Sequence, residues 1–329
     1  MSFWFYYLYL LLGSSLSRSY MKRIDIEKTN KLLELSGAVV IKDFLSKKEL
    51  SILQGIFEKN ENQNINNNNN GVVFYNNQKF ISQALVHSKE LFNFVTGENF
   101  FSLCQKYLDK PIIKACRLYQ TGGGGVSMWH HDEKNEKYIS KGLIAIIYLS
   151  DVLTENDGPF EFIRGTHNNS IEMLDEDFFV ENINSLYGSQ ISSVYGKSGT
   201  LILADSKIIH RARPHNNKIF RKSFFMQISS YNKKIYKERI LINPAFVSDD
   251  FFHDRDRLSF LGFGIKSVEH IFPPTNIDHM PLNQEIISVL TKWVSKSILK
   301  KIFETLPLFL KKYLRRKFNR NVDYDSIKT

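Results

Sequence analysis

His130 and Asp132 are the residues whose types and spacing point most directly to chemistry. They stand one residue apart in the segment Trp129-His130-His131-Asp132. Alternate side chains of an extended strand point to the same side, so these two would share a face and His131 would point away. One imidazole and one carboxylate make two thirds of the facial triad that holds non-heme Fe(II) and leaves coordination positions open. A third ligand must come from elsewhere in the chain.

Two histidines further along the chain are candidates for the third ligand. His210 comes 80 residues after His130, just past a predicted strand at 200–203. His215 follows Pro214 in a polar segment that is typical of a turn. We therefore favour His210 and keep His215 as the alternative. His131 with Glu133 forms a second, overlapping pair of the same kind, which we rank below His130 with Asp132.

The elements that must position these residues are mostly strands. Period-2 patterns and turn signals dominate 112–228. The predicted strands are 142–149, 160–163, 199–203 and 220–228, with one more at 37–41. The predicted helices are 28–35, 46–57, 81–92 and 100–108. Many short strands preceded by helices predict a mainly β core with flanking helices, namely a double-stranded β-helix (jelly roll, cupin-like).

Arg221 opens the last predicted strand, eleven residues after His210. Alternation places Arg221, Ser223 and Phe225 on one face of that strand. A guanidinium beside a metal site suits bidentate capture of a carboxylate, because its planar fork matches the two carboxylate oxygens. A plain metal-binding jelly roll has no need of such a residue.

Charge is distributed unevenly along the chain, whose formal net charge is +10. Ten Lys/Arg lie between Lys292 and Arg320 with Glu304 as the only acid, so the rest is nearly neutral. A core that binds nucleic acid is not expected, because its basic footprint is missing. The two cysteines, Cys104 and Cys116, are too few for a disulfide framework and favour a reducing, cytoplasmic setting.

Both ends of the chain differ from the middle. Residues 1–20 include an apolar run that is too short to span a membrane and lacks the basic start of a signal peptide. It is a weak anchor, a packed segment or the result of an early start before Met21. Residues 282–329 predict a basic helical extension that either packs on the body or attaches to an anionic membrane surface. The domain between them is predicted to span 21–281.

Several separate motifs together resemble the phytanoyl-CoA dioxygenase (PhyH) family of Fe(II)/2-oxoglutarate-dependent oxygenases. The resemblance covers about residues 31–230. It rests on the strand and helix start at 37–50, the Trp-His-x-Asp segment at 129–132, Asn156-Asp157-Gly158-Pro159 with Gly165-Thr166-His167, and the distal His210 with Arg221. The chain departs from the family pattern at Ala212, where a hydroxyl residue often follows the distal histidine by two.

The resemblance implies a role for each matching residue. His130, Asp132 and His210 would bind Fe(II), and Arg221 would hold the distal carboxylate of 2-oxoglutarate. Ser223 and Tyr119 would add further contacts to that cosubstrate. The implied reaction consumes O2 and 2-oxoglutarate and releases succinate and CO2. Stimulation by ascorbate is expected. Because Asp132 retains the carboxylate that halogenating relatives lack, hydroxylation of a small organic molecule is expected.

A different class of function is the alternative. A non-catalytic jelly-roll protein that binds a metal or a small ligand would also use His130, Asp132 and His210. It would not need Arg221, so that residue separates the two hypotheses. The identity of the substrate cannot be predicted, since the residues that would line its pocket are not placed by any motif.

Overall fold

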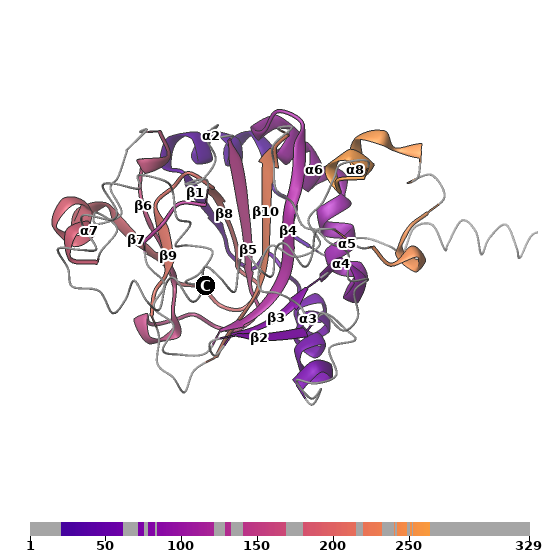
Figure 1. The fold of residues 1–329 in the computed structure, drawn as a ribbon, viewed down its shortest axis with the longest axis horizontal. Helices are drawn as coiled ribbons and strands as arrows, with labels where there is room; N and C mark the ends of the chain where they lie inside the picture. The colour runs from indigo at the N-terminus through magenta and orange to yellow at the C-terminus, as the bar shows by residue number, and fades with distance from the viewer. Residues whose placement is uncertain are drawn as a thin grey trace, which may run out of the picture.

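The fold was analysed in a computed structural model of the chain (Figure 1). It describes residues 21–61, 72–75, 78–82, 84–121, 129–132, 141–168, 180–214, 220–231, 240, 242–248, 251 and 253–263. All that follows concerns these residues. Four segments lie outside them: the N-terminal segment 1–20, the asparagine-rich segment 62–70, the glycine run at 122–125 and the basic tail 282–329.

Two antiparallel sheets form the centre of the structure. The large sheet has the strand order β1-β8-β5-β10-β4-β3-β2, and the small sheet has the order β7-β6-β9. The strands of the large sheet are β1 (Ala38–Ile41), β2 (Val72–Tyr75), β3 (Gln78–Ser82), β4 (Pro111–Thr121), β5 (Gly142–Tyr148), β8 (Leu201–Asp205) and β10 (Arg221–Ser230). The small sheet consists of β6 (Phe160–Ile163), β7 (Ile191–Val194) and β9 (His210–Ala212). The mainly β core with flanking helices, and with it the jelly roll, is confirmed.

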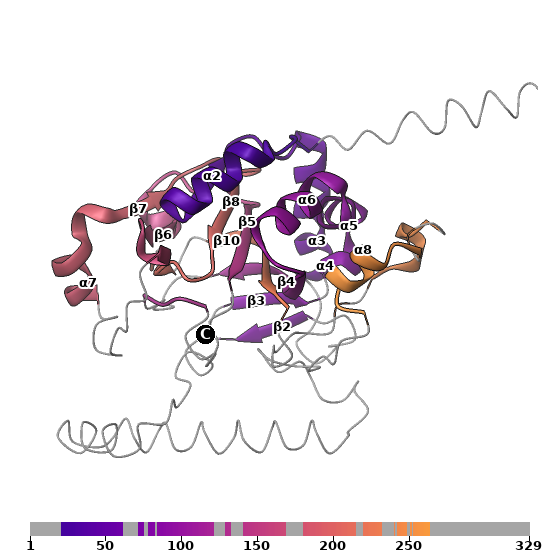
Figure 2. The ribbon, with the colours of Figure 1, turned by 90° about the horizontal axis from the view of Figure 1, so that it is seen from above.

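Helices cover the large sheet on the side away from the small sheet (Figures 1 and 2). They are α2 (Ile26–Ser36), α3 (Lys47–Glu61), α4 (Ala84–His87), α5 (Lys89–Thr96), α6 (Glu98–Tyr107) and α8 (Arg255–Phe260). A further helix, α7 (Val180–Tyr187), lies on the opposite side, beyond the small sheet (Figure 1). The layers are therefore helices, large sheet and small sheet.

Local sequence signals account for several helix ends. Asp25 caps α2 by accepting a hydrogen bond from the backbone N–H of Lys28, and Gly37 ends the helix with a φ of 78°. At the start of α3, the Glu49 carboxylate accepts from the backbone N–H of Ser46 at 2.8 Å, and the Ser46 hydroxyl accepts from the backbone N–H of Glu49 at 3.3 Å, which makes a capping box. The helix that follows begins at Lys47, within one residue of its predicted start.

The predicted helix at 81–92 is wrong in its first part. Ile81 belongs to β3, where it pairs with Leu118 of β4. The chain then forms two short helices, and Ser88 caps the second by accepting from the backbone N–H of Leu91. The prediction therefore holds for α4 and α5 and fails at residues 81 and 82, which belong to β3. Pairing with β4 sets the conformation of the preceding residues, and a single-sequence pattern does not contain it.

An apolar core fills the layer between the helices and the large sheet. Leu33, Phe57, Leu103, Leu203 and Phe224 are all completely buried there. Burying one such side chain stabilises the fold by about 1.5–3 kcal/mol. Cys104 and Cys116 belong to this core as free thiols, and burial raises the pKa of both, so they act as small hydrophobic side chains.

A second, smaller core lies between the two sheets. Ile144, Tyr148 and Ile202 contribute from the large sheet, and Phe160 and Phe162 contribute from β6. Partly buried Phe225 packs against this cluster, so the alternate residues of β10 that share its face also point towards the small sheet. That face includes Ser223 and Arg221.

Candidate metal centre

Backbone hydrogen bonds hold the segment 129–132 beside β9. The N–H of His130 donates to the carbonyl of His210 at 2.9 Å, and the N–H of His210 donates back to the carbonyl of His130 at 2.8 Å. The N–H of Asp132 donates to the carbonyl of Ser206 at 3.0 Å. Within the described part of the chain, the bridge between His130 and His210 is isolated. Two residues 80 positions apart in the sequence are thereby direct cross-strand neighbours.

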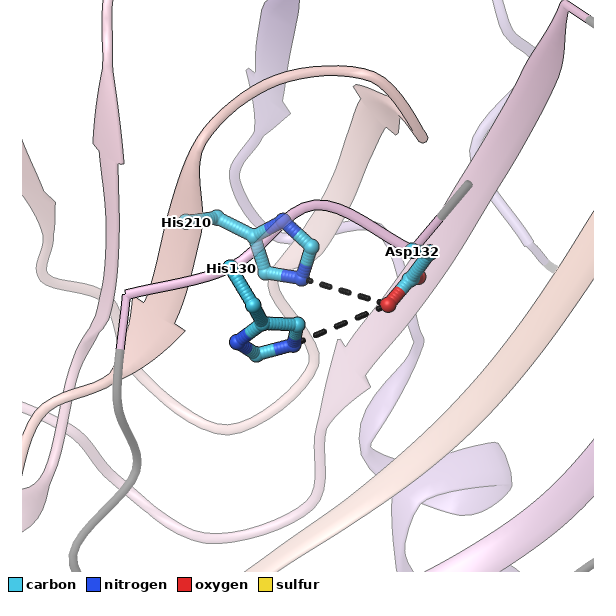
Figure 3. A group of neighbouring side chains, drawn as sticks. All are labelled: His130, Asp132 and His210. Atoms are coloured by element: carbon cyan, nitrogen blue, oxygen red, sulfur yellow. Dashed lines mark ion pairs between the residues drawn. The ribbon is translucent and has the colours of Figure 1, made fainter. Parts of the chain in front are cut away.

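The side chains of His130, Asp132 and His210 point towards one another (Figure 3). Nε2 of His130 lies 3.6 Å from Oδ1 of Asp132, and Nε2 of His210 lies 3.8 Å from the same oxygen. One ligand atom from each residue lies within 4.8 Å of the others. Among the described residues, no other His, Cys, Asp or Glu belongs to this group, and His215 and Glu133 lie outside the described part.

His210 is oriented by its own strand. Its Nδ1 lies 2.9 Å from the carbonyl oxygen of Ile208, which as an acceptor places the proton on Nδ1 and leaves Nε2 as the electron-pair donor. Burial, and then the nearby His130, lowers the pKa of His210 to about 4. The ring is therefore neutral at neutral pH, which is the form that binds a metal ion.

The three residues suit a divalent metal ion. Oδ2 of Asp132 is buried and has no hydrogen-bond partner in the described part of the chain. A buried carboxylate oxygen that lacks a donor is costly unless a cation satisfies it. Two imidazole nitrogens and one carboxylate oxygen form the donor set that suits Fe(II) with open coordination positions. The residues present therefore fit such an ion.

Arg221 lies at the start of β10 and is connected to the centre through β6. Its guanidinium NH1 donates to the carbonyl of Gly158, and two residues later the ring of Phe160 lies 5.3 Å from the ring of His210. Burial lowers the pKa of Arg221, and the Tyr148 hydroxyl opposes that effect. Its Nε is buried without a hydrogen-bond partner in the described residues, and none of their carboxylates pairs with it. A ligand carboxylate would satisfy this group.

Ser223 and Tyr119 lie directly opposite each other on β10 and β4. Ser223 is buried, whereas Tyr119 is partly exposed and its ring contacts that of Phe225 at 5.5 Å. The Tyr119 hydroxyl accepts a hydrogen bond from NH1 of Arg117 at 3.1 Å. Both residues therefore share the face of the large sheet that carries Arg221. The structure places the predicted set together on that face, and their roles stay a prediction.

Two features of this region were not predicted from the sequence. Tyr148 lies in the apolar run 142–149, which indicates a core residue. Its hydroxyl nevertheless accepts a hydrogen bond from the N–H of Phe160 at 2.8 Å and donates one to the carbonyl of Val194 at 3.1 Å. Burial raises its pKa to about 12, against the effect of Arg221. The second feature is the buried ion pair between Arg211 and Glu161. Arg211 follows a predicted ligand directly, but no spacing pattern marks its partner.

The sequence around these residues matches a known protein family. The sequence model of the phytanoyl-CoA dioxygenase (PhyH) family matches residues 33–223, which is more than half of the chain. The chain belongs to this family. The match to the PhyH family contains the segment 129–132, His210 and Arg221. Comparison with curated proteins gives no match.

Solved structures share the fold of this PhyH family member. The non-heme alpha ketoglutarate dependent epimerase SnoN from nogalamycin biosynthesis is similar with a TM-score of 0.50 at 14% identity, covering 62% of this chain and 83% of its own. HygX from Streptomyces hygroscopicus, with nickel and 2-oxoglutarate bound, has a TM-score of 0.50 at 13% identity, covering 64% of this chain and 89% of its own. At these identities the likeness concerns the fold.

Within the described residues, no helix combines the length and the apolar character that crossing a membrane requires. The predicted attachment of the basic tail to an anionic membrane surface concerns residues 282–329, which lie outside the described part. It stays a prediction.

Proposed function

We propose that this protein is an Fe(II)- and 2-oxoglutarate-dependent oxygenase that hydroxylates a small organic molecule and releases succinate and CO2. The observation that carries the proposal is the convergence of His130, Asp132 and His210, whose ligand atoms lie within 4.8 Å of one another. Membership of the PhyH family supports the same chemistry.

Each residue of the centre has a defined task in this proposal. His130 and His210 would donate ring nitrogens to the metal, and Asp132 would donate a carboxylate oxygen and balance part of its charge. Bound iron would supply the oxidative chemistry that couples decarboxylation of 2-oxoglutarate to oxidation of the substrate. The protein residues themselves bind and orient the reactants, and the three-ligand set leaves positions open for them.

Arg221 would hold the distal carboxylate of 2-oxoglutarate. A guanidinium binds a carboxylate through two parallel charge-assisted hydrogen bonds, which fixes orientation as well as affinity. Ser223 would donate its hydroxyl proton from the same face. Tyr119 would contribute its hydroxyl from the neighbouring strand β4, where it accepts a hydrogen bond from Arg117. Ala212 offers no hydroxyl, and one cosubstrate contact is expected to be missing.

Hydroxylation is proposed over halogenation, epimerisation and ring closure. The carboxylate of Asp132 occupies the position that halogenating relatives leave to chloride, which argues against halogenation. SnoN, which has the same fold, is an epimerase. The products differ in mass, because hydroxylation adds one oxygen atom, ring closure removes two hydrogen atoms and epimerisation changes nothing. Mass spectrometry of products from a substrate screen would therefore distinguish hydroxylation from ring closure, and a new chromatographic peak of unchanged mass would indicate epimerisation.

The proposal is tested by measuring succinate. Purified protein with Fe(II), ascorbate and 2-oxoglutarate in air should release succinate slowly even without its own substrate. Asp132→Ala should reduce this release to the background of the buffer, because the metal loses its only anionic protein ligand. Asp256→Ala removes an exposed aspartate of α8 and is the matched control. Succinate release by Asp132→Ala at the wild-type rate would contradict the proposed oxygenase function.

A further inference from the structure

Trp129 and Arg211 are the direct chain neighbours of the two histidines at the centre. Because side chains alternate along extended backbone, they point to the side opposite to His130 and His210. The guanidinium carbon of Arg211 lies 4.5 Å from the centre of the Trp129 ring, within the range of a cation–π contact. Trp129 is itself buried, in a cluster with Ile163, Ile183 and Ile209.

Glu161 of β6 fixes Arg211 in this position. Nε of Arg211 donates to Oε2 of Glu161 at 2.7 Å, and both side chains are buried. Ser193 and Arg213 donate to the other carboxylate oxygen at 2.9 and 3.0 Å. Burial alone would raise the pKa of Glu161, but the hydrogen bonds from Arg211 and then Arg213 outweigh it and hold the pKa below its usual value. The carboxylate is therefore charged at neutral pH and anchors the guanidinium.

The need for such an anchor follows from the weakness of the backbone bridge. Among the described residues, His130 is joined to β9 by one isolated bridge, with one further hydrogen bond from Asp132 to Ser206, which follows β8. A longer strand pair would fix the separation of the two histidines through many hydrogen bonds. Here the stacked pair of Arg211 and Trp129 connects the same two backbone segments on the face away from the metal ligands.

We infer that Glu161, Arg211 and Trp129 form a clamp that fixes the two imidazoles in the geometry required for metal binding. The inference rests on the proposed function, and the three are positioning residues, because none of them is among the proposed ligands. Partners that orient metal ligands from behind typically contribute about 10-fold to 100-fold in metal affinity. The clamp is expected to act at the lower end of this range, since the backbone bridge remains without it.

The test measures metal binding directly, with Co(II) as the probe under nitrogen. Titration of the full-length chain gives a dissociation constant, and the visible absorption of bound Co(II) reports ligand geometry. Arg211→Met should weaken Co(II) binding by about ten-fold and change the spectrum. Arg211→Lys should not restore either property, because a lysine ammonium cannot stack as a planar guanidinium does. Trp129→Phe should lie between these variants and the wild type.

Arg213→Met is the matched control. Arg213 is two residues along the chain from Arg211 and pairs with the same glutamate, but it is more exposed, and within the described residues it forms ion pairs with Glu161 and Glu155. This variant removes the same charge and should keep the affinity and the spectrum of the wild type. Equal losses in both arginine variants would show a general charge effect and overturn the clamp.

Unfolding is followed separately, so that lost structure is not mistaken for lost metal geometry. Thermal unfolding in EDTA gives the stability of each metal-free variant, and added Co(II) should raise the midpoint less in Arg211→Met than in the wild type. If Arg211→Met does not fold, Trp129→Phe decides the question with the same two readouts. Wild-type affinity and spectrum in a folded variant would overturn the inference alone. Absence of Co(II) binding by the wild type would overturn it together with the proposed function.

Discussion

The two faces of the large sheet are formed by the same strands but carry different chemistry. On β10, Phe224 faces the helices, is completely buried and lies 6.5 Å from the ring of Phe94. Its neighbours Ser223 and Phe225 face the small sheet, as Arg221 does. The outer face is packed with apolar side chains, whereas the inner face also carries the polar groups of Arg221 and Ser223.

The outer face therefore contributes stability, and the inner face contributes the groups that would bind ligands. The outer face supplies stability, because a buried phenyl ring gains free energy from leaving water whatever is bound elsewhere. The inner face gives up some of that stability. Nε of Arg221 on this face, and Oδ2 of Asp132 on the segment beside β9, are buried without hydrogen-bond partners in the described residues, which is costly in the absence of ligands. Substitutions on the two faces should therefore affect different properties.

The largest expected effect is on the outer face. Phe224→Ala removes a completely buried ring and should lower the free energy of unfolding by about 4 kcal/mol. Urea unfolding measures this change. Succinate release per folded molecule should stay at the wild-type level.

The neighbouring substitution Ser223→Ala is the control for that prediction. It removes one hydroxyl from the inner face and should change the free energy of unfolding by about 1 kcal/mol or less while weakening the binding of 2-oxoglutarate. If Phe224→Ala and Ser223→Ala changed stability equally, the division between the two faces would be wrong.

The buried pair of Glu161 and Arg211 gives the next largest effect, and a dependence on pH that the apolar layer lacks. Glu161→Gln removes the charge that balances two arginines and should cost about 3 kcal/mol at neutral pH. The folded-state pKa of Glu161 is lowered from a usual value of 4.5, so its contribution is complete above 4.5 and is lost as the pH falls through the lowered value.

Unfolding curves of wild type and Glu161→Gln at several pH values check this prediction. The difference in stability between them should be constant at neutral pH and should shrink as the pH falls below 4.5. Phe224→Ala, measured in parallel, should show a difference from wild type that is independent of pH. A difference for Glu161→Gln that grows in acid would contradict the assigned direction of the pKa shift.

Much of the fold could be predicted because its signals are local. The capping box of Ser46 and Glu49 marks the start of α3, and the apolar run at 142–149 marks the strand β5. The strands β2 and β3 were missed, since β3 depends on pairing with β4 and β2 depends on pairing with β3. The same limit applied to Ile81, whose helical spacing did not reveal that it lies in a sheet.

The candidate site could be predicted where a motif fixes relative positions along the chain. His130 and Asp132 are found from alternation on one segment, and Arg221 from the strand that it opens. Their convergence with His210 required the fold, because 80 residues separate the two histidines. Tyr148 and Glu161 could not be identified, since each matters through a contact with a distant residue and belongs to an otherwise ordinary strand.

The central claim is that the inner face binds 2-oxoglutarate through both the metal and Arg221. Calorimetric titration of 2-oxoglutarate into the Fe(II)-loaded protein under nitrogen tests it most directly, with Arg213→Met as control. We predict one site per chain, binding that is lost without metal, and affinity about 100-fold weaker in Arg221→Met, from the loss of two charge-assisted hydrogen bonds. Metal-independent binding, or equal affinity in Arg221→Met and wild type, would contradict the claim.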